Sequence, residues 1–255
     1  MVYKRKFDPN SLPTPALTFR QWLAGVIDGD GYFGFCKKRG NPRAGLRMEM
    51  SVEKADLPLL LHAFQGLGYG SIRCEGSYYR LAIGERAAVL HLISLVEGYS
   101  HNSTRRDQIE EILRHYTLPI TVPPQRPVAK SGWAPGFFDA DGTLVLTQSG
   151  ERGEKVKITV SATNNKLKDL LPLKESFGGT IVSITRKDTQ TTHHRWHMQG
   201  QQDILNFTHY AQSAPFQSQK SKRFALVARA YALHGEGAHL VGHERHGEWL
   251  ELRKE

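Results

Sequence analysis

Two aspartates in the sequence stand where their carboxylates could hold a metal ion. Asp30 and Asp141 are each the second aspartate of a short Asp-x-Asp-Gly segment, and they lie 111 positions apart. An apolar stretch typical of a buried helix precedes each one, and the glycine that follows is a common helix stop. A carboxylate there adds to the partial negative charge of the helix C-terminus. Two such helices lying parallel would bring like charges together, and a hard divalent cation such as Mg²⁺ relieves that repulsion.

Small residues line one side of each predicted helix. Gly25 and Gly29 are four positions apart in the first copy, and Gly136 and Ala140 hold the same places in the second. This spacing lets two helix backbones approach closely. A glycine inside a helix costs about 1 kcal/mol relative to alanine, so its use in both copies favours a packing role. We expect the two helices to pack together about a pseudo-two-fold axis. For a single copy, a local Asp-Gly turn is the alternative.

The similarity of the two copies extends beyond these helices. Residues 23–31 match residues 134–142, and the apolar spacing that predicts a helix from Leu57 recurs from Leu167, 110 residues later. A last helical pattern that starts at Ile109 recurs 115 residues later. Three features in the same order, with nearly the same offset, indicate a tandem duplication.

The duplication divides the chain into two repeats, 1–116 and 133–233. Four prolines between them, in residues 117–132, exclude a continuous helix or central strand and predict an extended linker. Residues 234–255 belong to neither repeat, and their glycine-rich composition predicts a solvated tail. The alternative for this tail is a zinc site at helical spacing, formed by His239, His243 and His246.

The composition favours a nucleic-acid partner. Lysine and arginine number 34 against 25 acidic residues, which gives a net charge of +9, and the sequence pI is about 9.6. Both halves are basic, so the charge is not confined to a tail. Two cysteines do not make a disulfide framework, and no apolar run approaches the ~18 residues of a membrane span. The first residues lack the apolar stretch of a secretory signal, so we expect a protein that is not secreted.

Alternating apolar and polar residues follow each Asp-x-Asp-Gly segment and predict strands with a core face and an outward face. The outward face carries the side-chain types that reach phosphates and base edges; an ordinary solvated sheet face is the alternative for any single residue. The outward residues that we expect to contact the nucleic acid are Lys38, Arg47, Glu49, Arg73, Arg80, Thr147, Lys157, Thr159, Arg195 and His197.

The two nine-residue copies resemble the motif of the LAGLIDADG homing endonucleases. The first matches at nearly every position. The second has Ala134 and Pro135 in place of the motif's first two residues but keeps its glycines and aspartates. The resemblance covers roughly residues 17–233. It implies an α+β fold of two tandem αββαββα repeats related by pseudo-two-fold symmetry, each with a four-stranded antiparallel sheet, forming a DNA-binding saddle.

The resemblance also implies the site. In that family the last aspartate of each motif binds metal, here Asp30 and Asp141, and the backbone carbonyls at Gly29 and Ala140 support it. Two or three divalent ions are implied, Mg²⁺ for activity with Mn²⁺ or Ca²⁺ substituting for binding. The family places a basic residue near each pocket, and the helical register pairs Arg105 with Lys220; Asn102 is a rival to Arg105. A glutamine usual in the family is absent from the end of the second strand, and its role stays unassigned.

The function that this resemblance implies is that of an intron-encoded meganuclease. We expect a monomer that makes a double-strand break in a long, non-palindromic DNA target by metal-dependent phosphodiester hydrolysis, leaving 3′ overhangs. The alternatives are a maturase that binds the host intron RNA and a DNA-binding regulator without nuclease activity. The family implies an organelle, chloroplast or mitochondrion, or a microbial cytoplasm.

Overall fold

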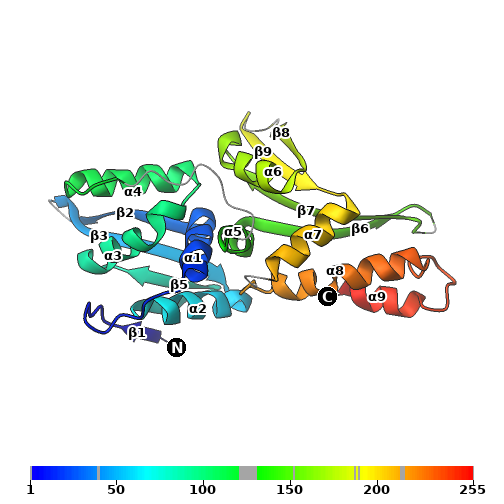
Figure 1. Ribbon diagram of the computed structural model, residues 1–255, viewed down its shortest axis with the longest axis horizontal. Coiled ribbons are helices and arrows are strands. Elements are labelled where there is room, and N and C mark those ends of the chain that lie inside the picture. Colours follow the sequence, from blue (N-terminus) through cyan, green and yellow to red (C-terminus); the bar gives the residue numbers. More distant parts are fainter. Residues whose placement is uncertain are drawn as a thin grey trace. The chain divides into compact units, whose positions relative to one another are not determined.

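The computed structural model describes residues 2–38, 41–120, 131–151, 153–186, 188, 190–212 and 216–254 (Figure 1). Most of the predicted linker, residues 121–130, lies outside this part of the chain. The chain divides into two units, Met1–Asp141 and Gly142–Glu255, so the helix of the second motif belongs to the first unit. No helix among the described residues has the length and apolar character to cross a membrane.

The first unit is a five-stranded antiparallel sheet with packed helices. The strand order is β1-β4-β5-β3-β2, and helices α2 and α3 contact its strands. Helix α5 packs along α1. The elements are β1 (Val2–Arg5), α1 (Leu17–Asp30), β2 (Gly31–Lys38), β3 (Asn41–Glu53), α2 (Leu57–Leu67), β4 (Gly70–Glu75), β5 (Tyr78–Ile83), α3 (Arg86–Val96), α4 (Ser103–His115) and α5 (Trp133–Asp141).

Strand β1 makes this sheet larger than the sequence analysis predicted. Four strands were expected, and that number was wrong here because Val2–Arg5 pairs with β4 as a fifth strand. Phe7, just beyond β1, packs edge-to-face on Tyr69 with ring centroids 5.0 Å apart. Because β1 lies ahead of the duplicated segments, comparison of the two repeats could not reveal it.

The second unit holds a four-stranded antiparallel sheet in the order β6-β7-β9-β8. Together with α5, its elements follow the same order as those from α1 to α4. The α+β fold of two tandem αββαββα repeats is therefore confirmed. The elements are β6 (Gly142–Ser149), β7 (Lys155–Asn164), α6 (Leu171–Phe177), β8 (Thr180–Thr185), β9 (Thr192–Met198), α7 (Gln201–Ala211), α8 (Lys220–Gly235) and α9 (His246–Lys254).

The alternation of the central strands produces the buried sheet faces that were predicted. Met48 in β3 pairs with Phe33 on one neighbouring strand and Ile83 on the other, and all three are at most 2% exposed. In the second sheet, Val160 and Trp196 are fully buried. Burying such large apolar side chains contributes roughly 1.5–3 kcal/mol each. The same alternation therefore directs the remaining side chains of these strands outward.

Helix α6 begins later than its sequence pattern suggests. The spacing from Leu167 predicts a single helix, but Leu167–Asp169 forms a separate 3-10 turn and α6 starts at Leu171. Pro172 occupies the first turn of α6. Proline fits there because its missing N–H needs no partner, whereas it cannot continue a helix that began earlier.

The C-terminal segment is folded, so the prediction of a solvated tail was wrong. Trp249 of α9 is fully buried, and its Nε1 donates to Oε1 of Gln148 at 2.8 Å. His246 lies 3.0 Å from the carbonyl of Ala238 through Nδ1, so it takes part in holding the turn before α9. Within the described residues, no group of three histidine, cysteine or acidic side chains is arranged to hold a metal ion. The zinc alternative for this segment is therefore not supported.

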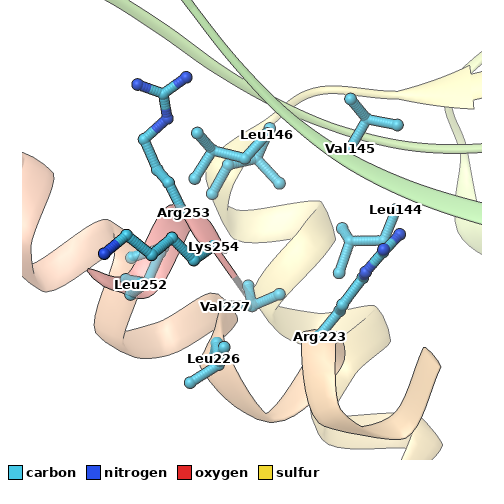
Figure 2. A pocket seen from close by; sticks show the side chains of 11 residues that line it. Leu144, Val145, Leu146, Arg223, Leu226, Val227, Leu252, Arg253 and Lys254 are labelled. Carbon is cyan, nitrogen blue, oxygen red and sulfur yellow. The ribbon is translucent and has the colours of Figure 1, made fainter. Parts of the chain in front are cut away.

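Helix α9 closes one side of a cavity in the second unit. Figure 2 shows this space, about 280 Å³, between β6, α8 and α9. Leucines from β6 and α9 provide apolar walls. Three cations from the two helices also line it, namely Arg223, Arg253 and Lys254. Arg253 donates to Gln148 at 2.9 Å, and Lys254 pairs with Glu251 at 2.5 Å, so two of these cations are engaged within the unit.

Candidate metal centre and nucleic-acid interface

The helices α1 and α5 pack backbone to backbone through their glycines. A Cβ placed on Gly25 would overlap the carbonyl of Trp133, and one placed on Gly136 would overlap the carbonyl of Trp22. A Cβ on Gly29 would likewise overlap that of Ala140. The predicted packing of the two small-residue helices is therefore confirmed. Only glycine permits such close approach, which explains its use inside both helices despite its helix-propensity cost.

Two reciprocal hydrogen bonds join the same helices. Nε1 of Trp22 donates to Oδ2 of Asp139 at 2.9 Å, and Nε1 of Trp133 donates to Oδ2 of Asp28 at 2.8 Å. All four side chains are at most 3% exposed. No role was predicted for these four side chains from the sequence. A signal was present, since Trp22 and Trp133 share the 111-residue offset of the aspartates.

The last aspartate of each motif occupies the end of its helix. Asp30 is the final residue of α1 and is exposed, and Asp141 is the final residue of α5 and is half-buried. A Cβ on Gly29 would lie 3.4 Å from Cγ of Asp141, so that carboxylate sits against the end of α1. Gly31 follows α1 directly, and a Cβ there would come within 2.7 Å of the carbonyl of Ile27. The glycine after the motif therefore lets the chain turn closely from helix into strand.

Arg105 of α4 lies beside these carboxylates. Its Nε donates to the carbonyl of Ile27 at 3.2 Å, and its Nη1 donates to Oε1 of Gln108 at 3.0 Å. Burial lowers the pKa of this guanidinium. The carboxylates that act in the opposite direction are those of Asp28, Asp141 and Asp30. The structure thus brings Arg105 into the electrostatic field of both motif ends, where an arginine remains charged.

Two other residues from the sequence analysis have local roles in their helices. Asn102, the rival to Arg105, is the N-cap of α4, and its Oδ1 accepts hydrogen bonds from the backbone of Thr104 and Arg105. Lys220 is the first residue of α8 in the second unit, with a half-buried side chain, and its backbone N–H donates to Oγ of Ser218 at 3.3 Å.

Asp28 is a fully buried acid in the first unit. Burial raises the pKa of its carboxyl to about 6, although hydrogen bonds from Ser100, His101, Trp133 and Asn102 favour the charged form. An unpaired buried charge is costly, so a set of four donors explains how the acid is tolerated there. The sequence alone could not show this burial, because an aspartate also stands two positions later, at Asp30, and that side chain is exposed.

The outward face of the first sheet carries paired charges. Arg80 in β5 lies 3.0 Å from Glu75 and 3.5 Å from Glu49, and Glu49 lies 3.4 Å from Arg47. Arg73 is exposed in β4, directly across the ladder from Arg80. Four of the predicted DNA-contacting residues therefore share one face. The fifth, Lys38, ends β2, and its side chain lies outside the described residues.

The outward face of the second sheet carries the remaining candidates. Thr147 and Lys157 are cross-strand partners and are exposed. Arg195 is half-buried, and its Nη2 donates to Oγ of Ser161 at 3.0 Å; Ser161 is paired with His197 across the ladder. Thr159 points to the same face by register but is only 9% exposed. It therefore offers the smallest surface to a ligand among these residues.

Two curated relatives have sequences similar to this chain over most of its length. A probable intron-encoded endonuclease aI2 of Debaryomyces hansenii is 29% identical over 229 residues, covering 85% of this chain and 34% of the relative. The intron-encoded RNA maturase bI4 of Saccharomyces cerevisiae is 30% identical over 220 residues, covering 86% of this chain and 33% of the relative. The chain thus spans about a third of the length of these relatives. No protein-family model matches it.

The fold is that of solved LAGLIDADG structures. The LAGLIDADG homing endonuclease I-GzeII, solved in complex with its DNA target, superimposes with a TM-score of 0.72 at 14% identity, covering 92% of this chain and 97% of that one. At such identity the match establishes the fold alone. The sequence relatives match 85% and 86% of this chain, and the helices that carry the two motif copies pack as the duplication predicted. The chain therefore has the fold of the LAGLIDADG homing endonucleases, and the relatives that its sequence resembles are intron-encoded proteins.

Proposed function

We propose that this chain is a site-specific endonuclease that makes a double-strand break in DNA with the help of divalent cations. The observation that carries the proposal is the pair of carboxylate-ended helices packed backbone to backbone, with Arg105 in the field of both carboxylates. The helix dipoles disfavour carboxylates at the C-terminal ends of these adjoining helices, and bound cations would offset that cost.

The donor set fits a hard divalent ion. Asp30 and Asp141 supply carboxylates, and the ends of α1 and α5 supply the carbonyls of Gly29 and Ala140. Mg²⁺ is commonly held by one or two carboxylates together with water and substrate phosphates, so a larger protein cluster is not required. We propose Mg²⁺, with two or three ions bound when DNA is present and Mn²⁺ or Ca²⁺ able to replace it for binding. Bound there, such ions would activate water and stabilise the charge that develops on the scissile phosphate.

The basic side chains of the site would act on the DNA itself. The Arg105 guanidinium donates to Ile27 and Gln108, which holds it in place, and it retains positive charge for a phosphate oxygen. We propose the corresponding role for Lys220 in the second repeat. Each repeat would act on one DNA strand, so a single chain acting as a monomer could cut both strands. We propose that the two cuts leave 3′ overhangs.

The outward sheet faces would bind the target. On the first face we propose contacts from Arg47, Glu49, Arg73 and Arg80, with Lys38 at its edge. On the second we propose contacts from Thr147, Lys157, Thr159, Arg195 and His197. Because the two faces carry different sets of side chains, the target need not be palindromic. We propose repeats at 1–116 and 133–233, joined by residues 117–132, as the units that read its two halves.

A maturase is the second candidate, because one relative is named an intron-encoded RNA maturase. Its partner would be the host intron RNA. A regulator without nuclease activity is less well supported, since both motif aspartates are retained at the helix ends. The relatives named above are intron-encoded, so we propose that this chain acts where its own intron is expressed, in an organelle or a microbial cytoplasm.

A cleavage selection from a randomised DNA library with Mg²⁺ tests the main proposal. We expect a discrete set of cut sequences, and Asp30→Asn or Asp141→Asn should abolish cutting, a loss of about 10³-fold or more, while DNA binding persists. Arg73→Gln is a matched control on the sheet face, which should change affinity and leave the chemical step intact. Cutting by both aspartate variants would refute the assignment. Binding without cutting by the unmodified protein, together with rescued splicing of an intron RNA, would favour the maturase.

A further inference from the structure

The carboxylate of Asp28 joins three segments of the first unit. Its Oδ1 accepts a hydrogen bond from the Ser100 hydroxyl at 2.5 Å. Its Oδ2 accepts from the backbone N–H of His101 at 2.6 Å and of Asn102 at 3.1 Å, and from Trp133 at 2.8 Å. Ser100, His101 and Asn102 form the approach to α4, and Trp133 begins α5. Asp28 therefore fastens the start of both helices to the end of α1.

The start of α4 leads directly to Arg105. Oδ1 of Asn102 accepts hydrogen bonds from the backbone N–H of Thr104 at 2.9 Å and of Arg105 at 3.2 Å. The Arg105 side chain then returns to α1, since its Nε donates to the carbonyl of Ile27, the residue before Asp28. The bonds thus form a closed path from Asp28 through the first turn of α4 and back to α1.

Gln108 fixes the second side of the guanidinium. Its Oε1 accepts from Arg105 at 3.0 Å and from the backbone N–H of Phe33 at 3.1 Å. Arg105 is thereby held between the end of α1 and the start of β2. Its orientation depends on where the first turn of α4 lies, and that turn is held by Asp28 and Asn102.

We propose that Asp28 is a positioning residue, whose buried carboxylate holds the first turn of α4 so that the Arg105 guanidinium faces Asp30 and Asp141. Its kinetic consequence rests on the proposed nuclease function, whereas the anchoring itself rests on geometry alone. A simpler packing role would leave Arg105 uncoupled from Asp28. An apolar residue of similar size would leave two backbone N–H groups ahead of α4 without an acceptor.

A double-mutant cycle distinguishes the positioning of Arg105 by Asp28 from a simple packing role of Asp28. Asp28→Asn keeps the size of the side chain but replaces one acceptor oxygen with a donor. We expect it to slow single-turnover cleavage of a selected target about tenfold at saturating DNA and Mg²⁺, with the DNA dissociation constant changed by less than about threefold. In an Arg105→Ala background the same substitution should change the rate by less than about twofold, because the group it positions is gone.

Leu113→Ala is the matched control within α4. Leu113 is buried in the same helix but makes none of the anchoring bonds. Its effect should be the same with and without Arg105. Ser100→Ala removes a single bond to Asp28 and should produce a smaller loss in the same direction, which covers the case in which Asp28→Asn does not fold. Equal losses for Asp28→Asn in both backgrounds would overturn the proposal, as would a loss confined to DNA affinity.

Hydrogen exchange gives a readout that needs no cleavage. Asp28→Asn should speed exchange at the backbone N–H groups of Asn102, Thr104 and Arg105, whereas Leu113→Ala should speed it along the whole of α4. Failure of the unmodified protein to cut any DNA would count against the nuclease function, and exchange would still decide the anchoring. Unchanged exchange at the first turn of α4 in Asp28→Asn would overturn the proposal in either case.

Discussion

The two sheets place their charges on the outward face in different ways. The first sheet presents arginines beside acids, with Arg80 held between Glu75 and Glu49. The strands of the second sheet contain no acidic residue, and Lys157 is exposed there. An arginine whose orientation is set by carboxylates suits recognition of one base edge, while its net charge is partly cancelled. An exposed lysine suits attraction to phosphates, which carries no sequence information.

The units also differ in the polar groups that they bury. In the first unit, Asp28 is fully buried and His101 packs edge-to-face on Trp133 with ring centroids 4.8 Å apart. In the second sheet, the buried polar side chains are the hydroxyls of Thr159 and Ser161, and the Ser161 hydroxyl accepts a hydrogen bond from Arg195. Burial shifts the pKa of Asp28 and that of His101, so the stability of the first unit depends on pH through these two groups. The following experiments test these contrasts.

Acid should affect the first unit through His101. Burial, together with the positive charge of Arg106, lowers the pKa of His101 to about 4 from 6.5. As the pH falls below 6.5 the unfolded chain takes up the proton first, so this group removes stability progressively down to pH 4. His101→Gln should therefore narrow the difference in unfolding free energy between pH 7.5 and 4.5 by about 2.5 kcal/mol. Denaturant unfolding at the two pH values measures it.

The control for this experiment is the exposed His209→Gln in the second unit, which should leave the pH dependence unchanged. Asp28 titrates in the same range in both proteins, so the comparison isolates His101. An identical pH dependence in His101→Gln and the unmodified chain would show that the two units do not differ in this respect.

Arg80 should contribute to sequence discrimination. Arg80→Ala removes a guanidinium that Glu49, Glu75 and Tyr78 hold in one orientation. We expect a loss of about 2 kcal/mol in discrimination at one base pair, with little change in the salt dependence of binding. Binding to a target and its single-base variants, measured at several salt concentrations, gives both quantities. Uniform weakening on every sequence would place Arg80 with the phosphate contacts instead.

Lys157 should show the opposite behaviour, with the smallest effect. Lys157→Ala should weaken binding to all sequences alike, by about 1 kcal/mol or less, and lower the slope of log K against log salt by about 1. Thr147→Ala on the cross-strand neighbour is the control and should leave that slope unchanged. A change in base preference on removing Lys157 would contradict the contrast between the two faces.

Much of the fold could be predicted because the relevant signals are local and occur twice. Strand alternation and helix spacing correctly placed the core, and the duplication correctly predicted that α1 and α5 pack together. β1 was missed because it has no second copy, and the folded C-terminal helix was missed because composition does not report the burial of Trp249. Arg105 was named because the family resemblance implies a basic residue near each pocket and the helical register pairs it with Lys220; its catalytic role stays a prediction.

The sequence by itself determined the repeated architecture, the acidic helix ends and the basic strands, because periodicity and duplication can be read from the order of residues. Only the tertiary structure decided that Asp28 is buried while Asp30 is exposed, that each tryptophan bonds to the other helix, and that Arg80 lies between two glutamates. These outcomes depend on atoms that are distant in the chain and come within hydrogen-bonding range only once the helices and strands have packed.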